Sequence, residues 1–183
     1  GSLHARQLQQ VINDGAHAHG LASHLRDGLL PGRIERRILH QLIERKRGTT
    51  YALVLTPTRE LAAQILEDLN DLAVHTPITG AAVFGGVGMG AQEHAFRSGV
   101  GVIVATPGRL LDHFRAPYAK LRGLEFLVLD EADRMLDMGF LPDIKRVLKH
   151  IPAKRQTLFF SATMPPPIAA LTRELLHDPA TIN

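Results

Sequence analysis

The sequence predicts an α/β protein with a doubly wound parallel sheet flanked by helices. Short apolar runs rich in β-branched residues recur from residue 51 onward, and segments with helical spacing of apolar residues separate them. Such alternation is typical of parallel strands joined by crossover helices. Each apolar run also ends in polar or glycine residues, as strands do at the ligand-binding edge of such a sheet.

The composition fits a single globular domain. The chain has 183 residues, of which 45% are hydrophobic and 21% charged, and this length allows one sizeable core. The absence of cysteine excludes a disulfide framework and a thiolate zinc site. No apolar run reaches the roughly 18–20 residues of a membrane span, and no signal peptide is visible. We therefore expect a cytoplasmic protein with no membrane partner.

The first fifty residues differ from the remainder. They hold eight lysines and arginines against four acidic residues, whereas residues 51–183 hold thirteen against fourteen, so the net charge of +3 arises at one end. Helices are predicted at residues 3–13 and 34–47, with a glycine-rich stretch at 13–32 between them. We therefore divide the chain into a divergent basic helical segment at 1–50 and a domain at 51–183.

The domain at residues 51–183 consists of alternating strands and helices. The predicted strands are residues 51–55, 81–84, 100–105, 126–129 and 157–160. The predicted helices are residues 58–76, 90–98, 108–115, 141–150 and 167–176. Because the strands are parallel, their carboxyl ends meet at one edge of the sheet, where a site is expected.

Two adjacent carboxylates follow the strand at residues 126–129. Asp130 can hold a divalent cation through its water shell, since magnesium retains several waters. Glu131 can orient or deprotonate a water that attacks a phosphoryl group. Acidic residues also open helices as caps, and Asp133 can have that role alone. The position at the end of a buried strand favours a catalytic site.

Two other strand ends share a proline, small or hydroxyl residues, and an arginine at the start of a helix. Backbone N–H groups, hydroxyls and a guanidinium in this arrangement suit the phosphates of a nucleic acid. The alternative is ordinary helix-start chemistry, with a threonine cap and a proline in the first turn. Two such starts in one sheet favour contacts to successive phosphates. The residues are Pro57, Thr58, Arg59, Glu60, Thr106, Pro107, Gly108 and Arg109.

A glycine-rich run follows the strand at residues 81–84. Gly86, Gly88 and Ala91 match the spacing of a dinucleotide-binding fingerprint, which would indicate a nicotinamide-dependent enzyme. The acidic residue expected about 20 residues later, at the end of the next strand, is missing. Glycines that let the backbone approach a phosphate chain are the better interpretation.

Together these motifs resemble, in order, those of the DEAD-box family of ATP-dependent RNA helicases, in the first of its two RecA-like domains. The matching segments are residues 57–62 for motif Ia, 85–86 for the glycine doublet, 106–109 for motif Ib, 128–133 for motif II and 161–163 for motif III. The resemblance implies a single RecA-like domain.

The resemblance also implies roles for individual residues. Asp130 would coordinate Mg²⁺ through water, and Glu131 would activate the hydrolytic water. Asp133, Ser161 and Thr163 would couple the nucleotide state to RNA strand separation. The residues implied in contacts to the RNA backbone are Pro57, Thr58, Arg59, Glu60, Gly86, Thr106, Pro107, Gly108 and Arg109. Such binding tolerates any sequence and is sensitive to salt.

Two motifs of the family are not found. The family carries a P-loop with Gly-Lys-Thr upstream of motif Ia, and this chain contains no Gly-Lys dipeptide. No glutamine motif for adenine is found either. Residues 38–42 resemble the end of the helix that follows the P-loop, which places the loop near residues 23–28. Three explanations for the missing motifs stay open. The segment has diverged, the sequence upstream of residue 38 carries a rearrangement or reading-frame change, or the first fifty residues have been replaced.

We therefore predict the N-terminal domain of an ATP-dependent RNA helicase. The intact protein would use ATP and Mg²⁺, bind RNA and require a second RecA-like domain. Without a phosphate cradle, this chain is expected to bind ATP poorly and to be inactive alone. The alternative is a non-catalytic RNA-binding or protein-interaction module on a degenerate helicase fold.

Overall fold

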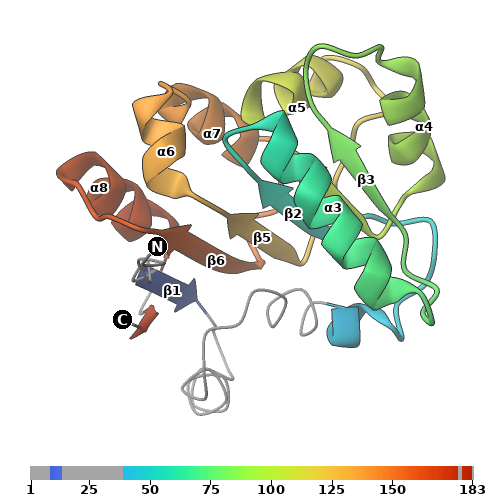
Figure 1. Ribbon diagram of the computed structural model, residues 1–183, viewed down its shortest axis with the longest axis horizontal. Helices are drawn as coiled ribbons and strands as arrows, with labels where there is room; N and C mark the ends of the chain where they lie inside the picture. Colours follow the sequence, from blue (N-terminus) through green and yellow to red (C-terminus); the bar gives the residue numbers. More distant parts are fainter. Residues whose placement is uncertain (1–8, 14–38, 177–178, 183) are drawn as a thin grey trace, which may run out of the picture.

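The computed structural model describes residues 9–13, 39–176 and 179–182, and their strands form one seven-stranded sheet in the order β3-β4-β2-β5-β6-β1-β7 (Figure 1). Five neighbouring strands are parallel, which confirms the predicted fold class. They are β2 (Ala52–Leu55), β3 (Gly80–Val83), β4 (Val102–Ala105), β5 (Phe126–Leu129) and β6 (Gln156–Ser161).

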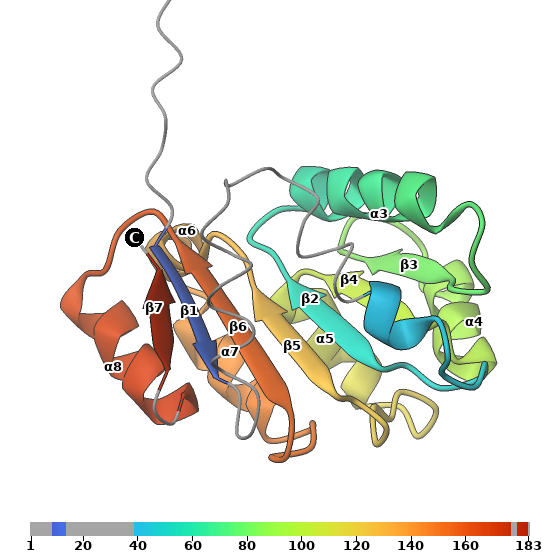
Figure 2. The same ribbon diagram turned by 90° about the horizontal axis from the view of Figure 1, so that it is seen from below.

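Helices cover both faces of the sheet, and each face has its own core. In β2, Leu53 and Leu55 enter one core, whereas Ala52 and Val54 enter the other. α3 (Arg59–Ala73) covers the second face together with a helical turn at residues 39–42. The first face is covered by α4 (Gly90–Ser98), α5 (Pro107–Phe114), α6 (Ala132–Asp137), α7 (Leu141–Leu148) and α8 (Pro166–Leu175). In Figure 2, α3 lies along one side of the sheet, with α5 and α7 on the other. Burial on both faces explains why the central strands β2, β4 and β5 are apolar along their whole length.

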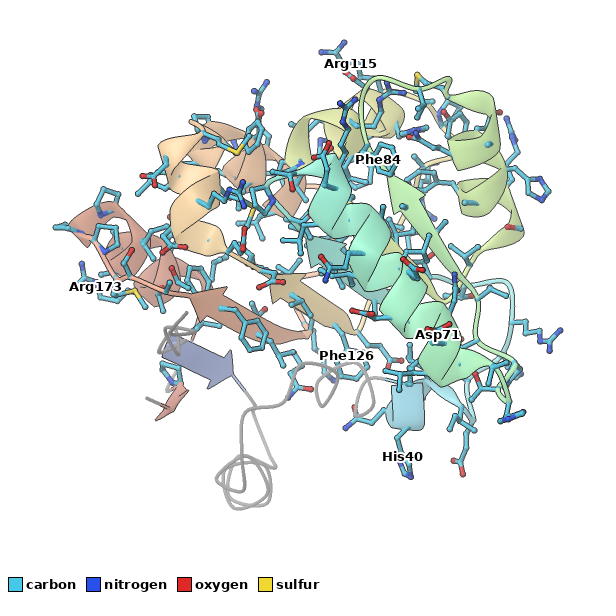
Figure 3. The ribbon with its side chains drawn as sticks, viewed as in Figure 1. His40, Asp71, Phe84, Arg115, Phe126 and Arg173 are labelled. Atoms are coloured by element: carbon cyan, nitrogen blue, oxygen red, sulfur yellow. The ribbon has the colours of Figure 1, made fainter. Side chains whose placement is uncertain are left out.

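The strand register aligns the carboxyl ends of the strands that precede the predicted site segments. Leu55 pairs with Ala105 on one side and with Leu129 on the other, and Leu129 pairs with Phe159. The residues that follow these strands therefore start at the same edge of the sheet. Figure 3 shows Phe84, which follows β3, at this edge, opposite Phe126 at the start of β5.

A helix is predicted at residues 3–13, and this prediction is wrong for residues 9–13, the part of the segment that the structure describes. Gln9–Asn13 forms strand β1, which pairs antiparallel with β6 and with β7 (Ala180–Ile182). The backbone of β6 needs hydrogen-bond partners on this side, and the β-branched pair Val11 and Ile12 suits a strand. Pairing with a distant segment thus overrides the local helical spacing.

Smaller differences concern the ends of elements. The helix predicted at residues 34–47 is helical at 39–42 and then turns, so its basic end lies outside the helix. α6 and β7 were not predicted, and β3 lies one residue earlier than expected. The remainder of the predicted first helix and nearly all of the glycine-rich stretch at 13–32 lie outside the described residues. Within the described ranges, no helix is both long and apolar enough to cross a bilayer.

Candidate functional site

β5 places the acidic pair at the carboxyl edge of the sheet. The backbone N–H of Asp130 donates to the carbonyl of Leu55 at 2.9 Å, which extends the β2–β5 ladder by one bond. Glu131 then adopts a φ of 49°, a left-handed conformation that no other non-glycine residue shares among those described. Its N–H donates to Asp130 Oδ1 at 2.9 Å. Strained backbone of this kind clusters at functional positions, and this turn leaves both carboxylates partly exposed at the edge.

The carboxylate of Glu131 has a charged partner on the next helical turn. Its Oε2 accepts a hydrogen bond from Arg134 Nη1 at 3.0 Å, with 28% of the Glu131 side chain and 57% of the Arg134 side chain exposed. Exposed pairs of this kind contribute about 0–1 kcal/mol. Glu131 can therefore exchange the guanidinium for a water molecule at little cost in free energy.

The three residues predicted to couple the motifs meet in one network. Asp133 Oδ2 accepts from both the N–H and the hydroxyl of Thr163, each at 2.9 Å. The N–H of Asp133 donates to Ser161 Oγ at 3.1 Å, and that hydroxyl donates to the carbonyl of Thr163 at 2.7 Å. Since Ser161 is fully buried, the network ties the first turn of α6 firmly to the segment after β6.

This network sets the charge of Asp133. Burial raises the pKa of its carboxyl, but the hydrogen bonds from Thr163 and from the backbone N–H of Arg134 outweigh burial and hold the pKa below its ordinary value of 3.8. Asp133 is therefore ionised at neutral pH. The N-cap of α6 is Glu131, and Asp133 lies in the first turn, where its Oδ1 accepts from the N–H of Arg134 at 3.0 Å. Asp133 therefore has a helix-start role, and its carboxylate in addition joins two separate segments.

Motif Ia begins α3. Thr58 is the N-cap, with a φ of −129°, and its Oγ accepts from the N–H of Leu61 at 3.2 Å. Arg59 Nε donates to Glu60 Oε1 at 2.8 Å, and this hydrogen bond lowers the pKa of Glu60. Thr56, just before this motif, has a buried hydroxyl that donates to the carbonyl of Thr58 at 3.2 Å. For Thr58 the helix-cap interpretation is confirmed, and the cap aims the first turn of α3 at the edge.

Motif Ib begins α5 differently. The N–H of Thr106 donates to the carbonyl of Val83 at 3.0 Å, which ties this helix start to β3. Thr106 is the N-cap residue by position but makes no side-chain capping hydrogen bond. Pro107 is buried, whereas Gly108 faces open space and Arg109 is partly exposed. The helix-cap alternative therefore fails for the Thr106 hydroxyl, which remains suited to a ligand.

The glycine doublet lies against motif Ia. Gly86 has a φ of 83°, and a Cβ atom built on it would lie 3.0 Å from Arg59 Nη1. Positive φ at this value favours glycine. The segment after β3 and the start of α3 are therefore close neighbours, and Gly86 and Arg59 can meet the same ligand.

Replacing Gly86 by alanine should lower the free energy of unfolding by about 1 kcal/mol, the usual cost of a left-handed conformation in a non-glycine residue. The Arg59 side chain is flexible at its end, so its displacement adds little. Urea denaturation measures the change. Gly88→Ala is the matched control, because Gly88 has no positive φ and no atom within 4 Å of a new Cβ. Equal losses in both variants would contradict the argument.

Comparisons with known proteins decide the family. A model of the DEAD/DEAH box helicase family matches residues 34–171. This chain belongs to that family. It is 45% identical over 141 residues to the ATP-dependent RNA helicase CshA of Listeria monocytogenes, an alignment that covers 77% of this chain and 27% of CshA. It is 46% identical over 127 residues to the DEAD-box ATP-dependent RNA helicase 20 of Oryza sativa, covering 69% and 26%.

A solved structure agrees with this assignment. The crystal structure of a DEAD box protein from Methanococcus jannaschii superposes with a TM-score of 0.71 at 34% identity, over 79% of this chain and 40% of that one. The resemblance inferred from the motifs is thus confirmed, and the fold is the N-terminal RecA-like domain of a DEAD-box helicase. The chain spans about a quarter of the length of the curated relatives it matches.

The DEAD-box site contains one carboxylate suited to magnesium. Among the described residues, no group of three or more histidine and acidic side chains could hold a metal ion. Mg²⁺ is commonly bound by one or two carboxylates, with waters and substrate phosphates completing its shell. Asp130, partly exposed at the edge, fits that mode. Its Oδ1 already accepts from the backbone, which fixes the orientation of the carboxylate.

Proposed function

We propose that this domain binds the sugar-phosphate backbone of RNA and carries the magnesium ligand and the general base of an ATP-dependent RNA helicase. The observation that supports it best is the network of Asp133, Ser161 and Thr163. It joins the helix that follows the acidic pair to the segment after β6. A displacement at Asp130 and Glu131 is therefore transmitted to that segment. The same proposal puts the protein in the cytoplasm, where RNA and ATP are abundant.

The RNA contacts lie along the edge formed by motif Ia, the glycine doublet and motif Ib. Arg59 and Arg109 supply positive charge there, Gly86 permits close approach of the backbone, and Thr106 offers a hydroxyl at a helix start. The remaining proposed contacts are Pro57, Thr58, Glu60, Pro107 and Gly108. Contacts of this kind read charge and shape, so affinity should vary little with base sequence and fall with salt.

In the nucleotide half of the site, Asp130 would hold Mg²⁺ through water, and Glu131 would orient the attacking water and accept its proton. Bound ATP would supply the phosphoryl group. The sequence has no Gly-Lys dipeptide, and the lysine of a P-loop is a main partner of the phosphates. We therefore propose that this chain binds ATP weakly and that turnover needs residues beyond it, including a second RecA-like domain.

Titration with a fluorescent ATP analogue tests the nucleotide proposal. We expect no magnesium-dependent binding at micromolar analogue, whereas a labelled single-stranded RNA binds the same sample. Magnesium-dependent micromolar binding would contradict the proposed loss of affinity. RNA-stimulated phosphate release that Glu131→Gln abolishes would contradict the proposed inactivity. Asp137→Asn is the control for that variant, since Asp137 is exposed at the far end of α6.

A second candidate is a non-catalytic RNA-binding or protein-interaction module on the helicase fold. The missing Gly-Lys dipeptide favours it, and the intact pair of Asp130 and Glu131 argues against it. RNA binding without any nucleotide binding, even when the C-terminal part of the helicase core is supplied, would support this candidate. Restored ATP hydrolysis in that mixture would exclude it.

A further inference from the structure

A buried chain of hydrogen bonds links the glycine doublet to the helix of motif Ib. The side-chain amide of Gln92, on α4, donates from Nε2 to the carbonyl of Phe84 at 3.0 Å. Its Oε1 lies 3.0 Å from Nε2 of His113, on α5. The other ring nitrogen, Nδ1, lies 3.0 Å from the hydroxyl of Tyr118. Gln92 and His113 are buried, with 6% and 0% of their surface exposed.

These contacts fix the direction of every hydrogen bond. Because Gln92 uses its N–H to reach Phe84, its oxygen faces His113, and Nε2 of the imidazole must carry the proton. Nδ1 then accepts from the Tyr118 hydroxyl. Burial lowers the pKa of His113, and Arg109 acts in the same direction against the weaker opposing effects of Asp112 and Glu93. The ring is therefore neutral at pH 7. Each polar side-chain atom of Gln92 and His113 has a hydrogen-bond partner.

Phe84 is the residue immediately before the glycine doublet. It lies beyond the end of β3, an edge strand of the described sheet, so the sheet supplies no ladder partner to its carbonyl in that direction. Gln92 supplies that partner instead. The backbone that enters Gly85 and Gly86 is thus held by a side chain from α4, which is itself held by α5.

We propose that Gln92 and His113 are positioning residues for RNA binding, because their hydrogen bonds fix the glycine doublet relative to the start of α5. The inference rests on the proposed RNA contacts at Gly86 and Thr106–Arg109. Neither Gln92 nor His113 is proposed to touch the RNA itself. A fully satisfied polar network specifies one geometry more sharply than apolar packing does, and spacing between phosphate contacts needs such definition.

Aromatic and cation–π contacts also hold the rings of His113 and Tyr118 in place. The ring of Phe96, on α4, lies 4.9 Å from the His113 ring, and the guanidinium of Arg97 lies 5.0 Å from the centre of the Tyr118 ring. These contacts do not depend on the Tyr118 hydroxyl. Tyr118→Phe therefore removes one hydrogen bond to His113 while the ring, and the link from His113 through Gln92 to Phe84, stay in place.

This difference defines the experiment. Gln92→Met keeps the side-chain length but removes both hydrogen bonds of the amide, so it cuts the link to Phe84. Tyr118→Phe is the matched control, since it also deprives His113 of one partner. With the full 183-residue chain and a labelled oligouridine, we expect affinity to fall about tenfold in Gln92→Met, equivalent to about 1.4 kcal/mol, and less than about twofold in Tyr118→Phe.

A spectroscopic readout separates positioning from general loss of stability. In amide NMR spectra without RNA, the Gly85 and Gly86 signals should shift in Gln92→Met and stay in place in Tyr118→Phe. Equal affinities in the two variants, with unmoved glycine signals, would overturn the proposal. If Gln92→Met does not fold, Gln92→Asn is compared in the same way, because its amide is too short to reach both partners. If the wild-type chain binds no RNA, the proposed function fails, and the glycine signals still decide whether the network positions the doublet.

Discussion

Replacing Asp133 by alanine should lower the free energy of unfolding by about 2 kcal/mol, roughly the value of one hydrogen bond to a charged group. The carboxylate accepts two bonds from Thr163 and one from the N–H of Arg134. Thr163 and Arg134 are exposed, so water replaces part of these interactions and the total stays well below three full bonds. Chemical denaturation at pH 7 measures the change.

The same variant has a defined pH dependence. The pKa of Asp133 is lowered in the folded protein from its ordinary value of 3.8, so its contribution is fully present above pH 3.8. It is lost as the pH falls through the lower, folded-state pKa. The stability difference between wild type and Asp133→Ala should therefore shrink below about pH 4. Asp137→Ala, on the same helix and exposed, should change stability by less than about 0.5 kcal/mol. A difference constant from pH 7 to 3 would contradict the assignment.

The strands and the site edge were predictable because their signals are local. The central strands are continuous apolar runs, and Asp130 follows such a run directly. Burial on both faces requires that pattern, and parallel pairing then places every strand end at one edge. No knowledge of the distant partners was needed to locate this edge.

β1 was not predictable for the opposite reason. Residues 9–13 pair with β6, about 150 residues away, and nothing within five residues indicates that partner. The same holds for Asp133, whose role at the start of α6 can be inferred locally but whose further partners lie at Ser161 and Thr163. Long-range pairing decides these cases, and a single sequence carries no direct signal for it.

The sequence does contain a local indication that Gln92 and His113 are buried. Gln92 lies three and four positions before Ala95 and Phe96, the buried residues of α4, and His113 lies three positions after the buried Leu110 on α5. A polar side chain on the inner face of a helix must find a hydrogen-bond partner. Two such residues on successive helices therefore indicate a shared network, although not its target at Phe84.

Removal of the two arginines at the proposed RNA edge should have the largest effect on binding. Arg59 starts α3 beside Gly86, and Arg109 lies in the first turn of α5. The slope of log K against log salt is negative. If each arginine neutralises one phosphate of a single strand, the double variant Arg59→Ala/Arg109→Ala should reduce the magnitude of this slope by about 1.4. At low salt its affinity should fall roughly a hundredfold, or about tenfold for each arginine removed.

The matched control removes the same charge elsewhere. Arg47 is exposed and lines a cavity with Gly80 and Gly101, at the amino ends of β3 and β4, and Arg173 is exposed on α8. Arg47→Ala/Arg173→Ala has the same net charge as the test variant but leaves the carboxyl edge intact. Fluorescence anisotropy at several salt concentrations gives both slopes. If bulk charge attracts the RNA, affinity and slope fall equally in the two double variants. If the carboxyl edge binds it, they fall only in Arg59→Ala/Arg109→Ala.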